Sequence, residues 1–129
     1  MKWIPILIAL LLLSGCAVQI QKEQSYRQIN MDEAIAMMEA ESDYIILDVR
    51  TPEEFSEKHI PGAINVANET IGSKEIPELP DKDQLILVYC RSGNRSKQAS
   101  EKLVALGYTN IIEFGGINDW PGEVVSGAE

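Results

Sequence analysis

The sequence predicts an α/β fold, in which a single domain is built on a doubly wound parallel sheet flanked by helices. Two nearly continuous apolar runs, residues 44–49 and 85–89, have the composition of strands that are buried on both faces of a sheet. Helix signals follow each of these runs, and strands that alternate with helices favour a parallel sheet. A length of 129 residues allows one domain of modest size.

The domain is expected to begin with a strand over residues 26–29. Asn30 can cap a helix that extends over residues 31–41, in which apolar side chains recur at helical spacing. The apolar run 44–49 is then the first strand that both faces of the sheet bury. This part of the chain therefore gives a strand, a helix and a second strand.

A short second helix is predicted directly after this strand. Thr51 can act as its N-cap, Pro52 suits its first turn, and Glu54 completes a capping box. The helix is expected to end near His59, because a Pro-Gly pair follows.

The remaining elements are two strands, a long helix and a final strand. Residues 63–67 and 85–89 are predicted strands, and the stretch between them, up to residue 83, is expected to be mostly loop. A helix is predicted over residues 96–106, which a glycine ends, and a last strand over residues 111–114.

The N-terminus has the features of a secretory signal peptide. A short basic start precedes an apolar run over residues 3–13. This run is too short for a membrane-spanning helix, which needs about 20 residues. Residues 13–16, Leu-Ser-Gly-Cys, resemble the lipobox of bacterial lipoproteins. This resemblance implies cleavage after residue 15 and acylation of Cys16, whose lipid would give stable anchoring. A plain secretory signal or a buried N-terminal helix are the alternatives.

The predicted organisation is therefore a lipoprotein signal peptide (1–15), a lipidated Cys16 with a short tether (16–24) and one domain (25–125). Such a protein would be extracytoplasmic and anchored to a bacterial membrane, in the periplasm or on the cell surface. The mature chain would carry ten basic and 20 acidic side chains, a net charge near −10. This charge argues against a nucleic-acid partner, and we expect a monomer.

Cys90 is the strongest candidate for a functional residue. It directly follows the strand 85–89, and sites in parallel sheets form beyond the carboxyl ends of the strands. A tight loop that leads into a helix can turn several N–H groups and the positive end of the helix dipole toward one point. Arg91 and Arg95 add positive charge in an otherwise acidic chain. These features favour a thiolate, whereas the alternative is a small buried side chain beside two surface arginines.

The residues of this loop resemble the active-site loop of rhodanese-like sulfurtransferases. The loop reads Cys-Arg-Ser-Gly-Asn-Arg-Ser over residues 90–96. Residues 48–55 and 59–65 resemble a second signature of that family, and Gly115-Gly116 with Trp120 resembles its closing motif. The likeness covers about residues 25–122 in the right order, so it implies a rhodanese-like fold for nearly the whole mature domain.

The resemblance also implies a reaction in two steps. The Cys90 thiolate would attack the outer sulfur of a donor such as thiosulfate, release sulfite, and pass the resulting persulfide sulfur to cyanide or to a thiol acceptor. Loop amides would stabilise the persulfide, and Arg91 and Arg95 would bind the sulfonate. No cofactor or metal is expected. The residues implied to bind the substrate are Arg91, Ser92, Gly93, Asn94, Arg95 and Ser96.

Three further residues of these motifs, Asp48, Arg50 and His59, are expected to support the site rather than to react. Asp48 and Arg50 are better explained as a structural ion pair than as catalytic groups. For His59, the only histidine, a turn-capping role is favoured over proton transfer, and Trp120 is expected to belong to the core.

Two other functions remain open. Phosphatases and arsenate reductases with a Cys-x5-Arg loop share this fold by resemblance, but here the arginine falls one position earlier, at Arg95, and position 96 is a serine. The shorter loop suits a sulfur atom better than a phosphoryl group. The second alternative is a non-enzymatic persulfide carrier or redox-sensing module, because an exposed, reactive thiolate is readily oxidised.

Overall fold

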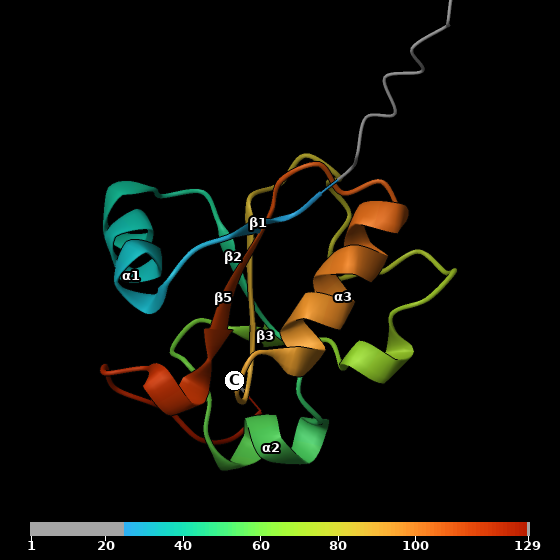
Figure 1. The fold of residues 1–129 in the computed structure, drawn as a ribbon. Helices are drawn as coiled ribbons and strands as arrows, with labels where there is room; N and C mark the ends of the chain where they lie inside the picture. Colours follow the sequence, from blue (N-terminus) through green and yellow to red (C-terminus); the bar gives the residue numbers. More distant parts are fainter. Residues whose placement is uncertain (1–24, 129) are drawn as a thin grey trace, which may run out of the picture.

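Five parallel strands form the central sheet of the computed structural model, which describes residues 25–128 (Figure 1). The strands are arranged in the order β1-β5-β4-β2-β3. Their bounds are β1 (Arg27–Gln28), β2 (Ile45–Asp48), β3 (Ile64–Asn65), β4 (Ile86–Cys90) and β5 (Ile111–Gly116). The predicted α/β fold with a parallel sheet in a single domain is therefore confirmed.

Helices cover both faces of this sheet. The three α-helices are α1 (Met31–Ala40), α2 (Pro52–Glu57) and α3 (Asn94–Ala105), and two short 3-10 helices are η1 (Asn68–Thr70) and η2 (Ile117–Asp119). Figure 1 shows α1 and α3 on opposite sides of the strands, with α2 beyond one end of the sheet. Within the described residues no helix has the length and apolar character needed to span a bilayer.

Two apolar clusters, one on each face, hold the layers together. One lies between the sheet and α3 and includes Val88, Ala99 and Leu103, all completely buried. The other lies against α1 and α2 and includes Ala34 and Phe55. Side chains of a strand alternate between the two faces, so β4 sends Val88 and Cys90 toward α3, and Leu87 and Tyr89 toward the other face.

The two predicted capping boxes are both present. The side chain of Asn30 accepts a hydrogen bond from the Glu33 amide at the start of α1, and Thr51 accepts one from the Glu54 amide at the start of α2. In both helices the glutamate also bonds back to the backbone of its cap residue. Local sequence signals therefore determine where these two helices begin.

One expectation from the sequence needs correction. The third helix begins at Asn94 rather than at residue 96, because Gly93, with a φ of 121°, makes the turn and no side chain caps the helix. The stretch 68–83 is mostly loop, as expected; it contains the short η1 and buries Ile71, Ile76 and Leu79 in the core cluster next to α3.

Residues 1–24 lie outside the described residues. The predicted signal peptide, the lipidated Cys16 and the tether all fall in that range, so they stay predictions. The predicted domain range of 25–125 also stays a prediction.

Candidate active site

Cys90 is the last residue of the central strand β4, and its side chain is buried, with 1% of the residue exposed. It is the only cysteine among the described residues and carries a free thiol. The chain turns back within three residues, and Gly93, the N-cap of α3, has a positive φ that other residues rarely adopt. The thiol therefore lies under a very tight turn at the carboxyl end of the sheet.

Two polar groups contact the Cys90 sulfur directly. The Gly93 amide donates a hydrogen bond to Sγ over 3.0 Å, and the hydroxyl oxygen of Ser96 lies 3.3 Å from the same atom. Both groups belong to the start of α3, where the helix dipole adds partial positive charge. The Gly93 amide and the helix dipole therefore stabilise negative charge on the sulfur, whereas the Ser96 oxygen accepts a hydrogen bond from the thiol.

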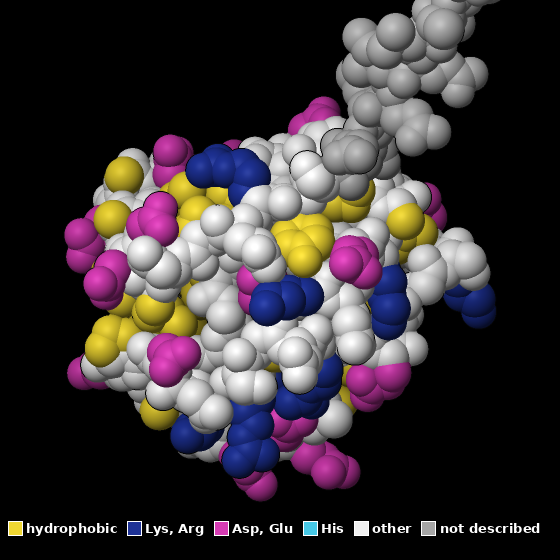
Figure 2. Space-filling model, viewed as in Figure 1, with side chains coloured by type: hydrophobic (Ala, Val, Ile, Leu, Met, Phe, Trp, Pro, Cys, Tyr) yellow, Lys and Arg dark blue, Asp and Glu magenta, His cyan; other side chains and the backbone are white. Residues whose placement is uncertain are grey.

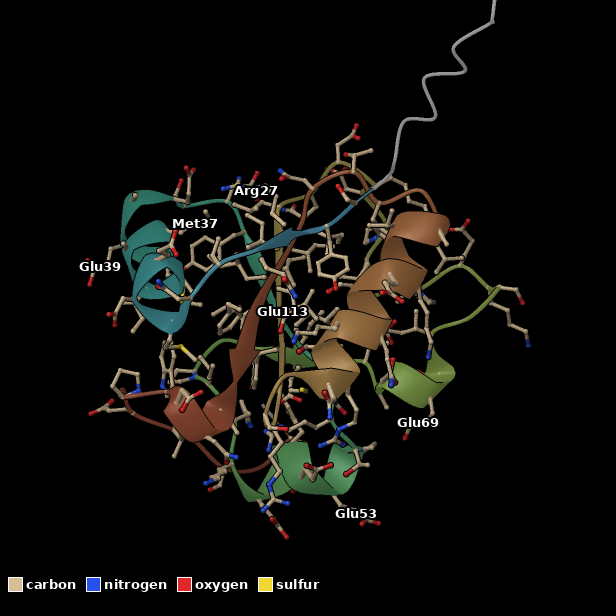
Figure 3. All side chains as sticks on the ribbon, viewed as in Figure 1. Arg27, Met37, Glu39, Glu53, Glu69 and Glu113 are labelled. Atoms are coloured by element: carbon tan, nitrogen blue, oxygen red, sulfur yellow. The ribbon has the colours of Figure 1, made fainter. Side chains whose placement is uncertain are left out.

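Ser96 joins the sulfur to a buried carboxylate that sequence analysis missed. Ser96 is completely buried, and its Oγ lies 2.7 Å from Glu113 Oε1. Glu113 belongs to β5, and Figure 3 shows it in the interior between β5 and α3. The alternation of β5 could have revealed it, because Glu113 must face the same side of the sheet as Ile111, which packs in the α3 cluster.

The turn after Cys90 rests on the backbone of β5. A Cβ built on Gly116 would lie 2.1 Å from the Arg91 carbonyl oxygen, so only glycine permits this approach. The Asn118 amide also donates to the Arg91 carbonyl over 3.2 Å. β5 bulges here: Val88 pairs with Glu113 but Cys90 with Gly116, so three residue steps on β5 match two on β4. The Gly115-Gly116 motif thus lets β5 pack directly against the turn that follows Cys90.

The polar side chains of the loop differ in their environment. The side chains of Arg91, Ser92 and Asn94 are exposed, so they are free to meet a ligand. Arg95 instead forms a bidentate pair with Glu54, with Nη1 to Oε1 at 2.6 Å and Nη2 to Oε2 at 2.9 Å. Its hydrogen bonds with Glu54 raise the pKa of Arg95. Burial acts to lower this pKa, and the charges of Glu54 and Cys90 act to raise it further. The pair links the start of α3 to α2.

The Glu54–Arg95 pair predicts a specific pH dependence of stability. The hydrogen bond from Arg95, helped by Thr51 and opposed by burial, lowers the pKa of Glu54 from 4.5 to about 2. A carboxylate whose pKa is lowered by folding stabilises the protein above its unfolded pKa, and this contribution is lost as the pH falls from 4.5 toward 2. Both side chains are partly exposed, at 31% and 25%, so screening keeps the contribution below about 1 kcal/mol.

Glu54→Gln isolates this effect, because glutamine can still complete the capping box. We expect the substitution to lower the free energy of unfolding by less than about 1 kcal/mol at pH 6, and the difference from wild type to vanish near pH 2. Urea unfolding at both pH values measures it. Glu53→Gln, at an exposed position in the same turn, is the control. A difference that is equally large at both pH values would contradict the pairing.

A buried ion pair supports the site from β2. Arg50 Nη2 lies 2.6 Å from Asp48 Oδ2, and the two side chains are 3% and 0% exposed. Arg50 also donates to the Lys58 carbonyl over 2.6 Å. Burial and the hydrogen-bonded, negatively charged Asp48 raise the pKa of Tyr89, whose hydroxyl accepts from the Ile60 amide. Asp48 and Arg50 thus form a framework under α2 and do not contact the Cys90 sulfur directly.

His59 and Trp120 also have structural contacts. His59 is fully buried, its ring stacks on Phe55 with centroids 3.7 Å apart, and its Nδ1 bonds to the Phe55 carbonyl at the end of α2. Its backbone pairs with Val125, which brings the C-terminal segment back to the domain. Trp120 is half-buried against the cluster next to α1, and its indole N–H donates to the Glu123 carbonyl.

Positive and negative side chains are mixed around the site. Figure 2 shows Lys and Arg side chains gathered with Asp and Glu over α2 and the start of α3. Within residues 25–128 no group of three or more His, Cys, Asp and Glu side chains is placed to hold a metal ion. The Cys90 sulfur has polar contacts with the Gly93 amide and the Ser96 hydroxyl, and Arg95 lies one residue before that serine.

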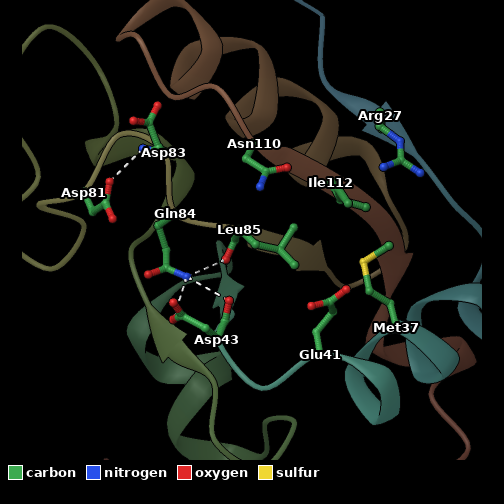
Figure 4. Close-up of a pocket in the computed structure, with 10 residues that line it drawn as sticks. All are labelled: Arg27, Met37, Glu41, Asp43, Asp81, Asp83, Gln84, Leu85, Asn110 and Ile112. Carbon is green, nitrogen blue, oxygen red and sulfur yellow. Dashed lines mark hydrogen bonds between the residues drawn. The ribbon is translucent and has the colours of Figure 1, made fainter.

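A hollow in the surface lies at the opposite end of the sheet from Cys90. Its volume is about 420 Å³, and Figure 4 shows carboxylates from several segments on its walls. Two of them, Asp81 and Asp43, bond to neighbouring loop groups rather than to each other. The hollow opens at the amino ends of β4 and β5 and contains none of the loop residues 90–96. It is therefore separate from the candidate active site.

Fold and site together define an α/β domain in which Cys90, at the carboxyl end of the central parallel strand, lies under a tight turn and accepts a hydrogen bond from the Gly93 amide. The sequence matches the model of the rhodanese-like domain over residues 30–123, and the chain belongs to the rhodanese-like domain family. The resemblance of the three motifs to this family is therefore confirmed.

Named relatives include sulfurtransferases. The chain is 38% identical over 73 residues to thiosulfate sulfurtransferase PspE of Escherichia coli, which covers 57% of this chain and 70% of PspE. It is also 38% identical over 90 residues to the adenylyltransferase and sulfurtransferase UBA4 of Candida albicans, covering 64% of this chain but only 20% of UBA4. Among solved structures, a rhodanese with anions from E. coli aligns with a TM-score of 0.59 at 36% identity, over 65% of this chain and 99% of that one. These relationships support rhodanese-type sulfur transfer as the general class of chemistry.

Proposed function

We propose that this protein transfers sulfane sulfur from a small anionic donor such as thiosulfate to cyanide or a thiol acceptor, through a persulfide on Cys90. The observation that carries the proposal is the environment of Sγ, with the Gly93 amide at 3.0 Å and the Ser96 hydroxyl at 3.3 Å. The name of PspE, a thiosulfate sulfurtransferase, supports thiosulfate as the donor class.

The first half-reaction loads the sulfur. The Cys90 thiolate attacks the outer sulfur of thiosulfate, a new S–S bond forms, and the bond to the sulfonate sulfur breaks so that sulfite leaves with the electron pair. The Gly93 amide and the positive end of α3 are placed to stabilise negative charge on the transferred sulfur. The second half-reaction transfers the sulfur to the acceptor. Cyanide or a thiolate attacks the outer sulfur of the persulfide, and Cys90 leaves as a thiolate.

Arg91 is the arginine best placed to bind the donor's sulfonate, because its side chain is exposed at the mouth of the loop. Arg95 is held by Glu54, and binding of a sulfonate by Arg95 would compete with that pair. We therefore infer that Arg91 makes the first contact with the donor and that Arg95 contributes mainly a positive field and the position of α3. The exposed Ser92 and Asn94 are available for further hydrogen bonds.

Steady-state kinetics test this proposal. With thiosulfate and cyanide varied against each other, a covalent persulfide intermediate predicts ping-pong behaviour, which appears as parallel lines in double-reciprocal plots. Converging lines would show that both substrates must bind before any sulfur moves, and would overturn the two-step reaction. A single round of transfer without turnover would instead favour the persulfide carrier.

We also propose that the protein works outside the cytoplasm, tethered to a bacterial membrane by lipid on Cys16. The proposal rests on the short apolar run over residues 3–13 and on the Leu-Ser-Gly-Cys sequence that follows it. The short tether 16–24 would keep the catalytic domain near the membrane. Because the mature chain as a whole is acidic, lipid rather than charge would be the means of attachment.

Replacing Cys16 with alanine is expected to move the protein from the membrane fraction to the soluble fraction, because the acyl acceptor is lost. Fractionation of cells that express the full chain, followed by immunoblotting, measures the distribution. Ser14→Ala, two residues earlier, is the matched control and is expected to remain with the membrane. A Cys16→Ala protein that stays in the membrane fraction would refute the lipid anchor.

A further inference from the structure

Glu113 is a buried carboxylate that the proposed sulfur transfer does not explain. Only 3% of the residue is exposed, and no Lys or Arg of residues 25–128 forms an ion pair with it. Its Oε1 accepts hydrogen bonds from the Gly115 amide at 2.9 Å and from Ser96 Oγ at 2.7 Å. A buried charge that is bonded only to neutral donors is costly, so its place beside the nucleophile requires a reason.

The Ser96 hydroxyl has one proton and several possible acceptors. Its oxygen lies 2.7 Å from Glu113 Oε1, 2.9 Å from the Gly93 carbonyl and 3.3 Å from Cys90 Sγ. The carboxylate is the nearest and the only charged acceptor, so it attracts the proton most strongly. The lone pairs of Ser96 Oγ then face Cys90, and the thiol can donate its proton to them. Cys90, Ser96 and Glu113 thus form a continuous hydrogen-bonded chain.

The other charged groups near the Cys90–Ser96–Glu113 hydrogen bonds either form ion pairs or are exposed to solvent. On the sulfur side, Arg95 of α3 is paired with Glu54 of α2, Asp48 of β2 is paired with Arg50, and Arg91 of the loop is exposed. On the Glu113 side, Tyr26 has a raised pKa, through burial first and then the charges of Glu101 and Glu113. A groove of about 410 Å³ opens there, with Glu113 on its wall together with Lys97, Glu33 and Asp119.

We propose that Glu113 is a positioning residue that shares one proton with the Cys90 thiol through the Ser96 hydroxyl. The thiol proton moves to Ser96 Oγ while the Ser96 proton moves to Glu113 Oε1, so the S–H bond breaks and an O–H bond to the carboxylate forms. The product is a thiolate beside a neutral carboxylic acid, and the cluster carries one negative charge before and after the step. The groove that Glu113 helps to line gives this proton a way to solvent. The role in catalysis rests on the proposed function.

Glu113→Gln removes the shared charge and keeps the shape of the side chain. In the wild type Cys90 and Glu113 share one proton, so the two groups titrate as a unit, and loss of that proton places two negative charges side by side. In the variant only the thiolate is charged, so the pH midpoint of Cys90 alkylation by iodoacetamide is expected to fall by about one unit or more. Alkylation at a pH below the wild-type midpoint then becomes about tenfold faster or more. Glu101→Gln, at an exposed position on α3, is the control and leaves the midpoint unchanged.

The Glu113→Gln substitution made in a Ser96→Ala protein tests whether the proton passes through the Ser96 hydroxyl. If the hydroxyl links the two groups, Glu113→Gln shifts the midpoint less in Ser96→Ala than in wild type, because the couplings are not additive. An unchanged midpoint in Glu113→Gln, or an equal shift with and without Ser96, would overturn the proposal. Alkylation needs no sulfur donor, so a protein that shows the shift but transfers no sulfur would refute the proposed function alone.

A measurement on the unaltered carboxylate covers the case in which Glu113→Gln does not fold. Carbon-13 NMR of the Glu113 carboxyl group is expected to show a second titration step, at the pH where Cys90 ionises, since coupling between two sites is reciprocal. The step is expected to be absent in Cys90→Ser. Identical Glu113 titration curves in the two proteins would show that the groups do not share a proton.

Discussion

Replacing Cys90 with serine is expected to abolish sulfur transfer from thiosulfate to cyanide and to leave the fold intact. The change replaces a sulfur atom by a smaller oxygen at a position that is 1% exposed. The Gly93 amide and the Ser96 hydroxyl, which contact the sulfur at 3.0 and 3.3 Å, can still bond to a hydroxyl. The serine oxygen cannot form a persulfide. Thiocyanate production measures the loss, and circular dichroism checks the fold.

Cys16→Ala is the matched control, because it removes the other of the two cysteines. Solubilised Cys16→Ala protein is expected to turn over at the wild-type rate, whereas Cys90→Ser is expected to show no activity above background. Retained turnover in Cys90→Ser would show that another group carries the sulfur. Equal losses in the two variants would point to a general effect of cysteine removal.

Asp48→Asn is expected to have the largest effect on stability. The substitution keeps the size of the side chain but leaves the positive charge of Arg50, which is 3% exposed, without its partner. Removal of one partner of a buried ion pair costs about 3–5 kcal/mol. That is a large fraction of the stability of a domain of this size, which is about 5–15 kcal/mol. The midpoint of urea unfolding is expected to fall accordingly.

The double variant Asp48→Leu/Arg50→Met separates the lost pair from the unpaired charge. Replacement of both partners by apolar side chains is often neutral or stabilising, so the double variant is expected to recover much of the stability lost in Asp48→Asn. Asp32→Asn, at an exposed position on α1, is the control for the loss of an aspartate. A wild-type unfolding midpoint in Asp48→Asn would show that the pair contributes little to the fold.

Local sequence signals predicted the parts of the fold that depend on neighbouring residues. The capping boxes at Asn30 and Thr51 determine where two helices begin, and the apolar runs 44–49 and 85–89 correspond to β2 and β4. The position of Cys90 at the end of the central strand follows from the same run. These features could be predicted because each depends on residues within a few positions of one another.

Contacts between distant segments could not be predicted in this way. Arg95 was expected to meet the substrate, but the structure pairs it with Glu54, 41 residues earlier in the sequence. Glu113 lies 17 residues beyond Ser96, and their contact depends on how β5 bulges under α3. Gly93 starts α3 without a side-chain cap, so the start of the helix was expected two residues too late. Each of these features depends on packing between elements rather than on local pattern.

The most direct test of sulfur transfer through Cys90 is the intact mass of the protein after incubation with thiosulfate. Transfer through Cys90 is expected to add one sulfur atom to the wild-type chain, which cyanide removes, and to add none to Cys90→Ser. A wild-type mass that does not change with excess thiosulfate, or an added sulfur that also appears on Cys90→Ser, would rule out a persulfide on Cys90.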